Sequence, residues 1–105
     1  MSVVSVTLQR GPNGLGFNIK GGKGHSIPIV ISKIDPNGPA ARISDMQIGA
    51  QLLSVNGVSV QQATHAEAVA MLKRDGAITM TLLHTDMWKG VPFEAWDYCK
   101  SAVEI

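Results

Sequence analysis

Two glycines and an arginine near the start of the chain have the types and spacing of an anion-binding turn. Arg10 precedes residues 11–17, which read Gly-Pro-Asn-Gly-Leu-Gly-Phe, and Gly14 and Gly16 can adopt backbone angles closed to other residues. Successive N–H groups that point the same way in such a turn form a concavity for anions. Arg10 can add positive charge directly or through a water. The expected chemistry is therefore non-covalent binding of a phosphate or a carboxylate.

The residues that follow the turn favour a carboxylate over a phosphate. A dinucleotide-binding turn needs G-x-G-x-x-G opening a helix, whereas Ile19 takes the third glycine position here, and Phe17, Asn18 and Ile19 alternate as in a strand. No Lys-Ser/Thr pair follows the glycines, as a Walker-type loop requires. A carboxylate turn leading into a strand with an open edge suits a peptide that ends in a carboxylate. An ordinary hairpin turn is the alternative when this stretch is considered alone.

Other chemistry finds little support in the sequence. His25, His65 and His84 are not spaced as metal ligands with cysteines or carboxylates. No serine or cysteine lies in a recognisable nucleophile motif, and the single cysteine, Cys99, excludes an internal disulfide. We therefore expect no catalytic residue, no metal site and no cofactor.

Short strands are predicted along most of the chain, because apolar and polar residues alternate in runs rich in β-branched side chains. Asn56-Gly57 is a strong hairpin signal between two of these runs. On the last strand, Ile78, Met80 and Leu82 are expected to share one face. The predicted strands are residues 3–9, 17–20, 29–34, 51–55, 58–60 and 77–83.

Two helices are predicted between the strands. Pro39 suits the first position of a short helix over residues 39–43. Thr64 is a favoured N-cap for a second helix that runs to about residue 74, and Glu67 three residues later completes a capping box. Strands with two helices between them indicate a small mixed fold, a capped and partly open barrel.

Four motifs in this order resemble the PDZ domain family. Gly14-Leu15-Gly16-Phe17 is similar to the carboxylate-binding loop of that family. One departure is Ala50, where the family often has aspartate. Together the motifs cover roughly residues 3–84 and are most similar to PDZ domains of discs-large-type scaffolds and cytoskeleton-associated tyrosine phosphatases. The remaining three are Gly38-Pro39-Ala40-Ala41, Gly49 with Leu52-Leu53-Ser54-Val55-Asn56-Gly57, and Thr64-His65 with Ala68-Val69.

The resemblance implies an α+β fold: a small, partly open antiparallel β-barrel or sandwich of five to six strands capped by two helices. It places the PDZ domain at residues 1–84 and a C-terminal extension at 85–105. Phe93, Trp96 and Val103 recur at roughly helical spacing in the extension. We expect a helix there. The alternative interpretation is that the extension is a tail ending in Ile105 that acts as a ligand.

The resemblance also implies a non-catalytic module that binds C-terminal peptides of the form Ser/Thr-x-apolar-COOH by strand addition between the second strand and the second helix. His65 would accept a hydrogen bond from the Ser/Thr hydroxyl. The residues that match the family's carboxylate-binding positions are Arg10, Leu15, Gly16 and Phe17. Those of the terminal side-chain pocket are Leu15, Phe17, Ile19, Val69 and Leu72. Those that select upstream ligand residues are Asn18, Ser32, His65 and Val69.

The partners implied by the resemblance are C-terminal tails of membrane receptors, channels or signalling proteins, met in the cytoplasm at membrane or junctional complexes. Self-association through the tail ending in Ile105 is a further expectation. The alternative is a regulatory PDZ module of a larger phosphatase or protease whose catalytic domain is absent here. The 105 residues carry a net charge of +1 and are 45% hydrophobic, which predicts one domain without nucleic-acid binding or direct membrane insertion.

Overall fold

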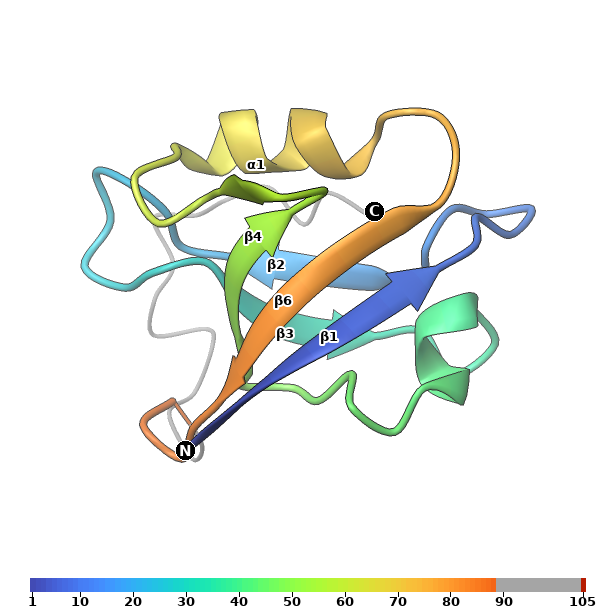
Figure 1. The fold of residues 1–105 in the computed structure, drawn as a ribbon, viewed down its shortest axis with the longest axis horizontal. Coiled ribbons are helices and arrows are strands. Elements are labelled where there is room, and N and C mark those ends of the chain that lie inside the picture. The colour runs from blue at the N-terminus through green and yellow to red at the C-terminus, as the bar shows by residue number, and fades with distance from the viewer. Residues whose placement is uncertain (89–104) are drawn as a thin grey trace.

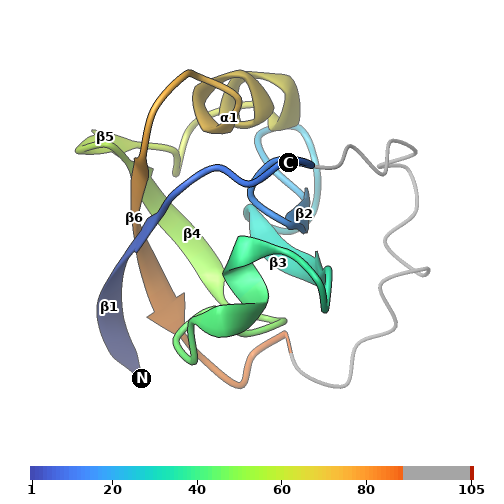
Figure 2. The same ribbon diagram turned by 90° about the vertical axis from the view of Figure 1, so that its right-hand side faces the viewer.

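The chain folds into a curved antiparallel sheet with helices at its two ends (Figures 1 and 2). The structure is a computed structural model that describes residues 1–88 and 105. The strand order is β1-β6-β4-β3-β2, and β5 pairs with β4 away from this path. The elements are β1 (Ser2–Leu8), β2 (Phe17–Lys20), β3 (Val30–Ile34), the 3-10 helix η1 (Pro39–Arg42), β4 (Gln51–Val55), β5 (Val58–Ser59), α1 (His65–Leu72) and β6 (Ile78–His84).

The α+β fold predicted from the sequence is confirmed, with two refinements. The sheet is open, because β1 and β2 stand at opposite ends of the strand order. The first expected helix is a short 3-10 helix, since the backbone at Ile43 is already extended, with φ −110° and ψ 114°. The helix expected in the extension falls on residues 89–104, outside the described residues, and the division at residue 84 stays a prediction.

Alternate side chains on the strands build the core. Ile78, Met80 and Leu82 of β6 are all fully buried, as their spacing predicted. On β2, Phe17 and Ile19 are buried in the same way. Because β2 ends the strand order, one of its two edges has no neighbouring strand among the described residues. That edge is available for another extended segment.

The start of α1 is fixed by the capping box that the sequence predicted. The Glu67 N–H donates to the Thr64 hydroxyl at 3.1 Å, and the Thr64 N–H donates to the Glu67 carboxylate at 2.9 Å. The backbone N–H of Thr64, followed by its hydroxyl, lowers the pKa of the Glu67 carboxyl below its usual value. Charged Glu67 therefore stabilises the helix start above its unfolded-state pKa, and this contribution is lost as the pH falls through the lowered folded-state pKa.

Replacing Thr64 by alanine should lower the free energy of unfolding by about 1 kcal/mol, because the Glu67 N–H at the helix start loses its acceptor, the Thr64 hydroxyl. Urea unfolding at neutral pH measures the change. The matched variant Thr64→Ser keeps a hydroxyl and should be nearly neutral. Equal losses in both variants would show that the cap hydrogen bond does not stabilise α1.

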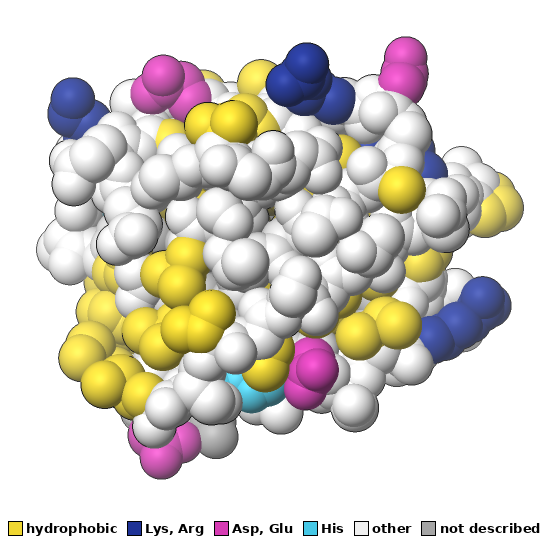
Figure 3. All heavy atoms as spheres, in the orientation of Figure 1, with side chains coloured by type: hydrophobic (Ala, Val, Ile, Leu, Met, Phe, Trp, Pro, Cys, Tyr) yellow, Lys and Arg dark blue, Asp and Glu magenta, His cyan; other side chains and the backbone are white. Residues whose placement is uncertain are grey.

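Charges of both signs are interspersed on the face shown in Figure 3. Hydrophobic side chains gather near the N-terminus in that view. Met1, Val3 and Met87, from the outer ends of β1 and β6, are exposed apolar residues. Among the described residues, no helix is long and apolar enough to cross a membrane.

Candidate functional site

The glycine turn before β2 is a tight loop closed by backbone hydrogen bonds. The Gly11 N–H donates to the Gly14 carbonyl at 2.9 Å, and the Gly14 N–H donates to the Gly11 carbonyl at 3.2 Å. Gly14 and Gly16 have φ angles of +95° and +85°, in the left-handed region where a side chain is disfavoured. The prediction that both glycines adopt unusual backbone angles is confirmed.

The carbonyl groups of this turn are bound to neighbouring elements. The Leu15 carbonyl accepts from the Ala40 N–H of η1 at 3.1 Å, and the Gly16 carbonyl accepts from the Asp35 N–H after β3 at 2.9 Å. A Cβ on Gly16 would lie only 2.9 Å from the Cα of Gly38. Gly16 is therefore required for the turn to pack against the segment that leads into η1.

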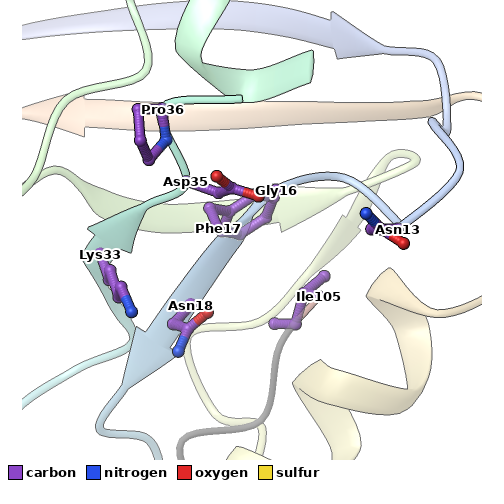
Figure 4. A pocket seen from close by; sticks show the side chains of 8 residues that line it. All are labelled: Asn13, Gly16, Phe17, Asn18, Lys33, Asp35, Pro36 and Ile105. Carbon is purple, nitrogen blue, oxygen red and sulfur yellow. The ribbon is translucent and has the colours of Figure 1, made fainter. Parts of the chain in front are cut away.

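The last residue of the chain, Ile105, lies along the free edge of β2. The Leu15 N–H donates to the backbone oxygen of Ile105 at 2.7 Å, and the Ile105 N–H donates to the Phe17 carbonyl at 3.0 Å. Figures 2 and 4 place Ile105 between β2 and α1. These contacts are those of an extended segment added to a sheet edge. The oxygen of Ile105 stands for a carboxylate oxygen of any peptide that ends at this point.

The Ile105 side chain is packed into the hydrophobic core of the domain. It is 3% exposed, so nearly all of its apolar surface is removed from water. The five residues predicted to form the terminal pocket contribute to the same apolar cluster: Leu15, Phe17, Ile19 and Leu72 are fully buried members, and Val69 packs against it partly buried.

Gly14 allows the backbone of Ile105 to come close to the turn. A Cβ on Gly14 would lie 2.5 Å from the backbone oxygen of Ile105 and 3.2 Å from its carbonyl carbon. The first distance is too short for any real pair of these atoms, so a side chain at this position would displace Ile105. The sequence indicated that small residues here would let another segment approach, and Gly14 is a position where an added side chain would collide with Ile105.

His65, the first residue of α1, presents one ring nitrogen to the loop after β2. Its Nδ1 lies 3.0 Å from the Gly21 carbonyl oxygen. Because a carbonyl only accepts, Nδ1 carries a proton, and Nε2 of the neutral ring is an acceptor. Nε2 is buried and has no hydrogen-bond partner within residues 1–88 and 105. A buried acceptor without a donor is unfavourable.

The loop after β2 is held against the start of α1 by further close contacts. The Lys23 N–H donates to the Ala63 carbonyl at 2.8 Å. A Cβ on Gly22 would lie 2.7 Å from the His65 nitrogen. The sequence predicted only a flexible glycine-rich loop here, because its glycines give no sign of a partner so far along the chain.

Arg10 connects the turn to the other end of α1. Its guanidinium donates to the Leu72 carbonyl at 3.0 Å and also to the Arg74 carbonyl. A cation is favourable at a helix C-terminus. Because the Arg10 side chain spans from the turn to these carbonyls, it holds the turn near the end of α1. The recorded partners of Arg10 are thus carbonyls, and its expected support of a ligand carboxylate stays a prediction.

A hollow of about 440 Å³ opens beside Ile105 on the side of β2 and β3 (Figure 4). Asn18 and Lys33, which are paired across the two strands, both line it together with Asp35. Asn18 was predicted to contact upstream ligand residues, whereas Ser32, the other strand residue predicted, does not line this hollow. Lys33, which the sequence analysis did not single out, lines the hollow because it is the cross-strand partner of Asn18.

Within residues 1–88 and 105, no three histidine, cysteine or acidic side chains gather closely enough to hold a metal ion. The described residues around Ile105 offer a backbone N–H at Leu15, a backbone carbonyl at Phe17 and an apolar cluster. Such a set recognises an extended peptide by its backbone, its terminal carboxylate and alternate side chains.

Comparison with known proteins gives consistent matches. The family model described as PDZ domain matches residues 5–83. The human "Multiple PDZ domain protein" is 43% identical over 83 residues, which cover 75% of this chain and 4% of that protein. The human "Protein lin-7 homolog B" is 46% identical over 81 residues, which cover 76% of this chain and 39% of that protein. The chain therefore spans well under half the length of these curated relatives.

A solved structure shares the same fold. The second PDZ domain of Dlg1 from the choanoflagellate Monosiga brevicollis matches with a TM-score of 0.76 and 35% sequence identity. The match covers 80% of this chain and 100% of that one.

Proposed function

The chain belongs to the PDZ domain family of protein-interaction modules, and we propose that it binds the C-terminal ends of other proteins without catalysing a reaction. The peptide adds as a strand to the free edge of β2 and lies in the groove between β2 and α1. The observation that carries this proposal is the position of Ile105, whose backbone pairs with Leu15 and Phe17 while its side chain is buried.

Two contributions would supply most of the affinity. A charge-assisted hydrogen bond from a backbone N–H to a carboxylate is worth about 1.5–3 kcal/mol. Burial of one apolar side chain in the pocket adds roughly 1.5–3 kcal/mol. The five residues predicted to line the pocket all carry apolar side chains and belong to or pack against the core cluster, so the pocket favours an apolar last residue.

The preferred ligand has the form Ser/Thr-x-apolar-COOH. The support for this motif is Nε2 of His65, which is buried, has no hydrogen-bond partner among the described residues and is an acceptor in the neutral ring. A hydroxyl two residues before the ligand's end would donate to it. Asn18 and Lys33, at the hollow beside Ile105, are available to contact other ligand residues.

The tails that fit this description belong, by family analogy, to membrane receptors, channels and signalling proteins. The chain would then act as part of a scaffold in the cytoplasm, held near membrane or junctional complexes by its partners. The comparisons support a protein-interaction role for the family, and the named partner classes are part of the proposal.

The test is a set of four titrations followed by fluorescence anisotropy. Fluorescein-labelled Lys-Ser-Ala-Thr-Glu-Ile and the same peptide with Val in place of Thr are titrated with the wild-type chain and with His65→Val. His65→Val should bind the Thr peptide more weakly than the wild-type chain does. Its affinity for the Val peptide should rise relative to its affinity for the Thr peptide, because the imidazole acceptor is exchanged for an apolar surface. The expected coupling is about 1–3 kcal/mol, the cost of leaving a buried polar group unpaired.

Thermal unfolding of His65→Val provides the control for folding. A coupling free energy within about 0.5 kcal/mol of zero would show that His65 does not select Ser or Thr in the ligand. Absence of binding by either peptide to the wild-type chain, even at millimolar protein, would overturn the proposed function itself.

A further inference from the structure

We propose that the groove of this chain is occupied by its own last residue, Ile105, in the same molecule, so that an external peptide binds only by displacing it. The proposal rests on the proposed function of the groove. It adds that Ile105 competes with external peptides for the same site.

The contacts of Ile105 are those expected of a bound ligand end. Its backbone oxygen accepts from Leu15 and its N–H donates to Phe17, at 2.7 and 3.0 Å. Its side chain is 3% exposed and belongs to the core cluster. The oxygen of Ile105 also lies next to Gly14, where the Cβ of any other residue would collide with it.

The chain is long enough to reach its own groove. Trp88, the last described residue before Ile105, follows β6, and seventeen peptide links join the two. A fully extended segment of that length spans at most about 60 Å, whereas the longest dimension of the molecule is 31 Å. Occupation within one molecule therefore needs no second copy.

The sequence of the tail fits the groove only in part. Ile105 supplies the apolar end, but the residue two before it is Val103, which carries no hydroxyl. Among the residues that the structure describes, the buried Nε2 atom of His65 has no hydrogen-bond partner. A tail that fills the pocket but leaves this acceptor unsatisfied is displaced more readily than one with Ser or Thr at that position.

Tethering compensates for weak intrinsic affinity. A tethered ligand experiences an effective concentration on the order of 1 mM, whereas a tail with this mismatch would have a dissociation constant on the order of 100 μM as a free peptide. The groove would then be mostly occupied by Ile105. An external peptide would bind roughly tenfold more weakly than to an open groove.

The experiment measures the affinity of fluorescein-labelled Lys-Ser-Ala-Thr-Glu-Ile for three forms of this 105-residue chain: wild type, Ile105→Asp and Ile48→Asp. Ile48 is 48% exposed in the loop before β4, so it is a matched substitution away from the groove. Ile105→Asp should bind the peptide about tenfold more tightly than wild type, and Ile48→Asp should bind it like wild type. A chain with Gly-Ser added after Ile105 should behave like Ile105→Asp without loss of any side chain.

Each result decides a separate question. Binding of equal strength by wild type, Ile105→Asp and the extended chain would overturn self-occupation and leave the proposed function intact. Failure of all chains to bind would overturn the proposed function. Sedimentation velocity from 10 μM to 1 mM should show a monomer, and concentration-dependent association lost in Ile105→Asp would show instead that the tail enters the groove of a neighbour.

Discussion

Replacing Gly14 by alanine is expected to abolish measurable binding of C-terminal peptides, a loss of at least about 100-fold. A Cβ at this position would lie 2.5 Å from the backbone oxygen that Ile105 places there, and that oxygen stands for the ligand carboxylate. The carboxylate would have to move away from the Leu15 N–H, which removes the charge-assisted hydrogen bond and lifts the side chain out of its pocket. Fluorescence anisotropy with Lys-Ser-Ala-Thr-Glu-Ile measures the effect.

The control must separate a blocked site from a strained backbone. Gly57 lies in the β4–β5 hairpin with φ +81°, and a Cβ there meets no atom within 4 Å. Gly57→Ala therefore carries a similar backbone cost, about 1–2 kcal/mol, without approaching the groove. Urea unfolding should show comparable losses of stability in the two variants, while only Gly14→Ala loses peptide binding.

Retention of near wild-type affinity by Gly14→Ala would contradict the assignment of this turn as the carboxylate site.

Gly16 is a poorer position for the same test, although it belongs to the same predicted glycine turn. Its added Cβ would meet the Cα of Gly38 at 2.9 Å, so Gly16→Val would disturb the packing of the turn against the segment leading to η1. Loss of binding there would report on folding as much as on recognition.

Converting the peptide's terminal carboxylate to an amide should weaken binding by about 1.5–3 kcal/mol, which is roughly 10- to 150-fold. The amide keeps an acceptor oxygen for the Leu15 N–H but loses the negative charge that makes this hydrogen bond strong. It also brings N–H donors to a turn whose groove-facing group at Leu15 is itself a donor. Isothermal titration calorimetry of the free and amidated peptides measures the difference.

The matched peptide has Gln in place of Glu one residue before the end, so it loses one negative charge without changing the terminus. It should bind much closer to the parent peptide than the amide does. Equal affinity of the free and amidated peptides would mean that the end of the ligand is not recognised, and the groove would then be a site for internal peptide segments.

Local sequence patterns specify most of the strands, the start of α1 and the glycine turn before β2. Thr64 and Glu67 specify the start of α1 because a capping box is a local interaction three residues apart. Gly14 and Gly16 specify the turn because their backbone angles exclude other residues. The alternation of Phe17 and Ile19 specifies which side of β2 is buried, and the same alternation predicts the core face of β6.

The sequence pattern was less informative where short segments balance competing preferences. The first helix was expected over residues 39–43, but it is a single 3-10 turn, Pro39–Arg42. Proline suits the start of either kind of helix, and the Gly38 position provides no side chain to cap a longer one. The extended backbone at Ile43 then ends it.

Tertiary structure alone decided which distant groups meet. Arg10 meets the carbonyls of Leu72 and Arg74, more than sixty residues away. The Nδ1 atom of His65 meets the Gly21 carbonyl, 44 residues away in the sequence. Ile105 reaches the edge of β2. Each pairing depends on the path of the whole sheet between the partners, and local propensity carries no information about a hydrogen bond formed across that distance.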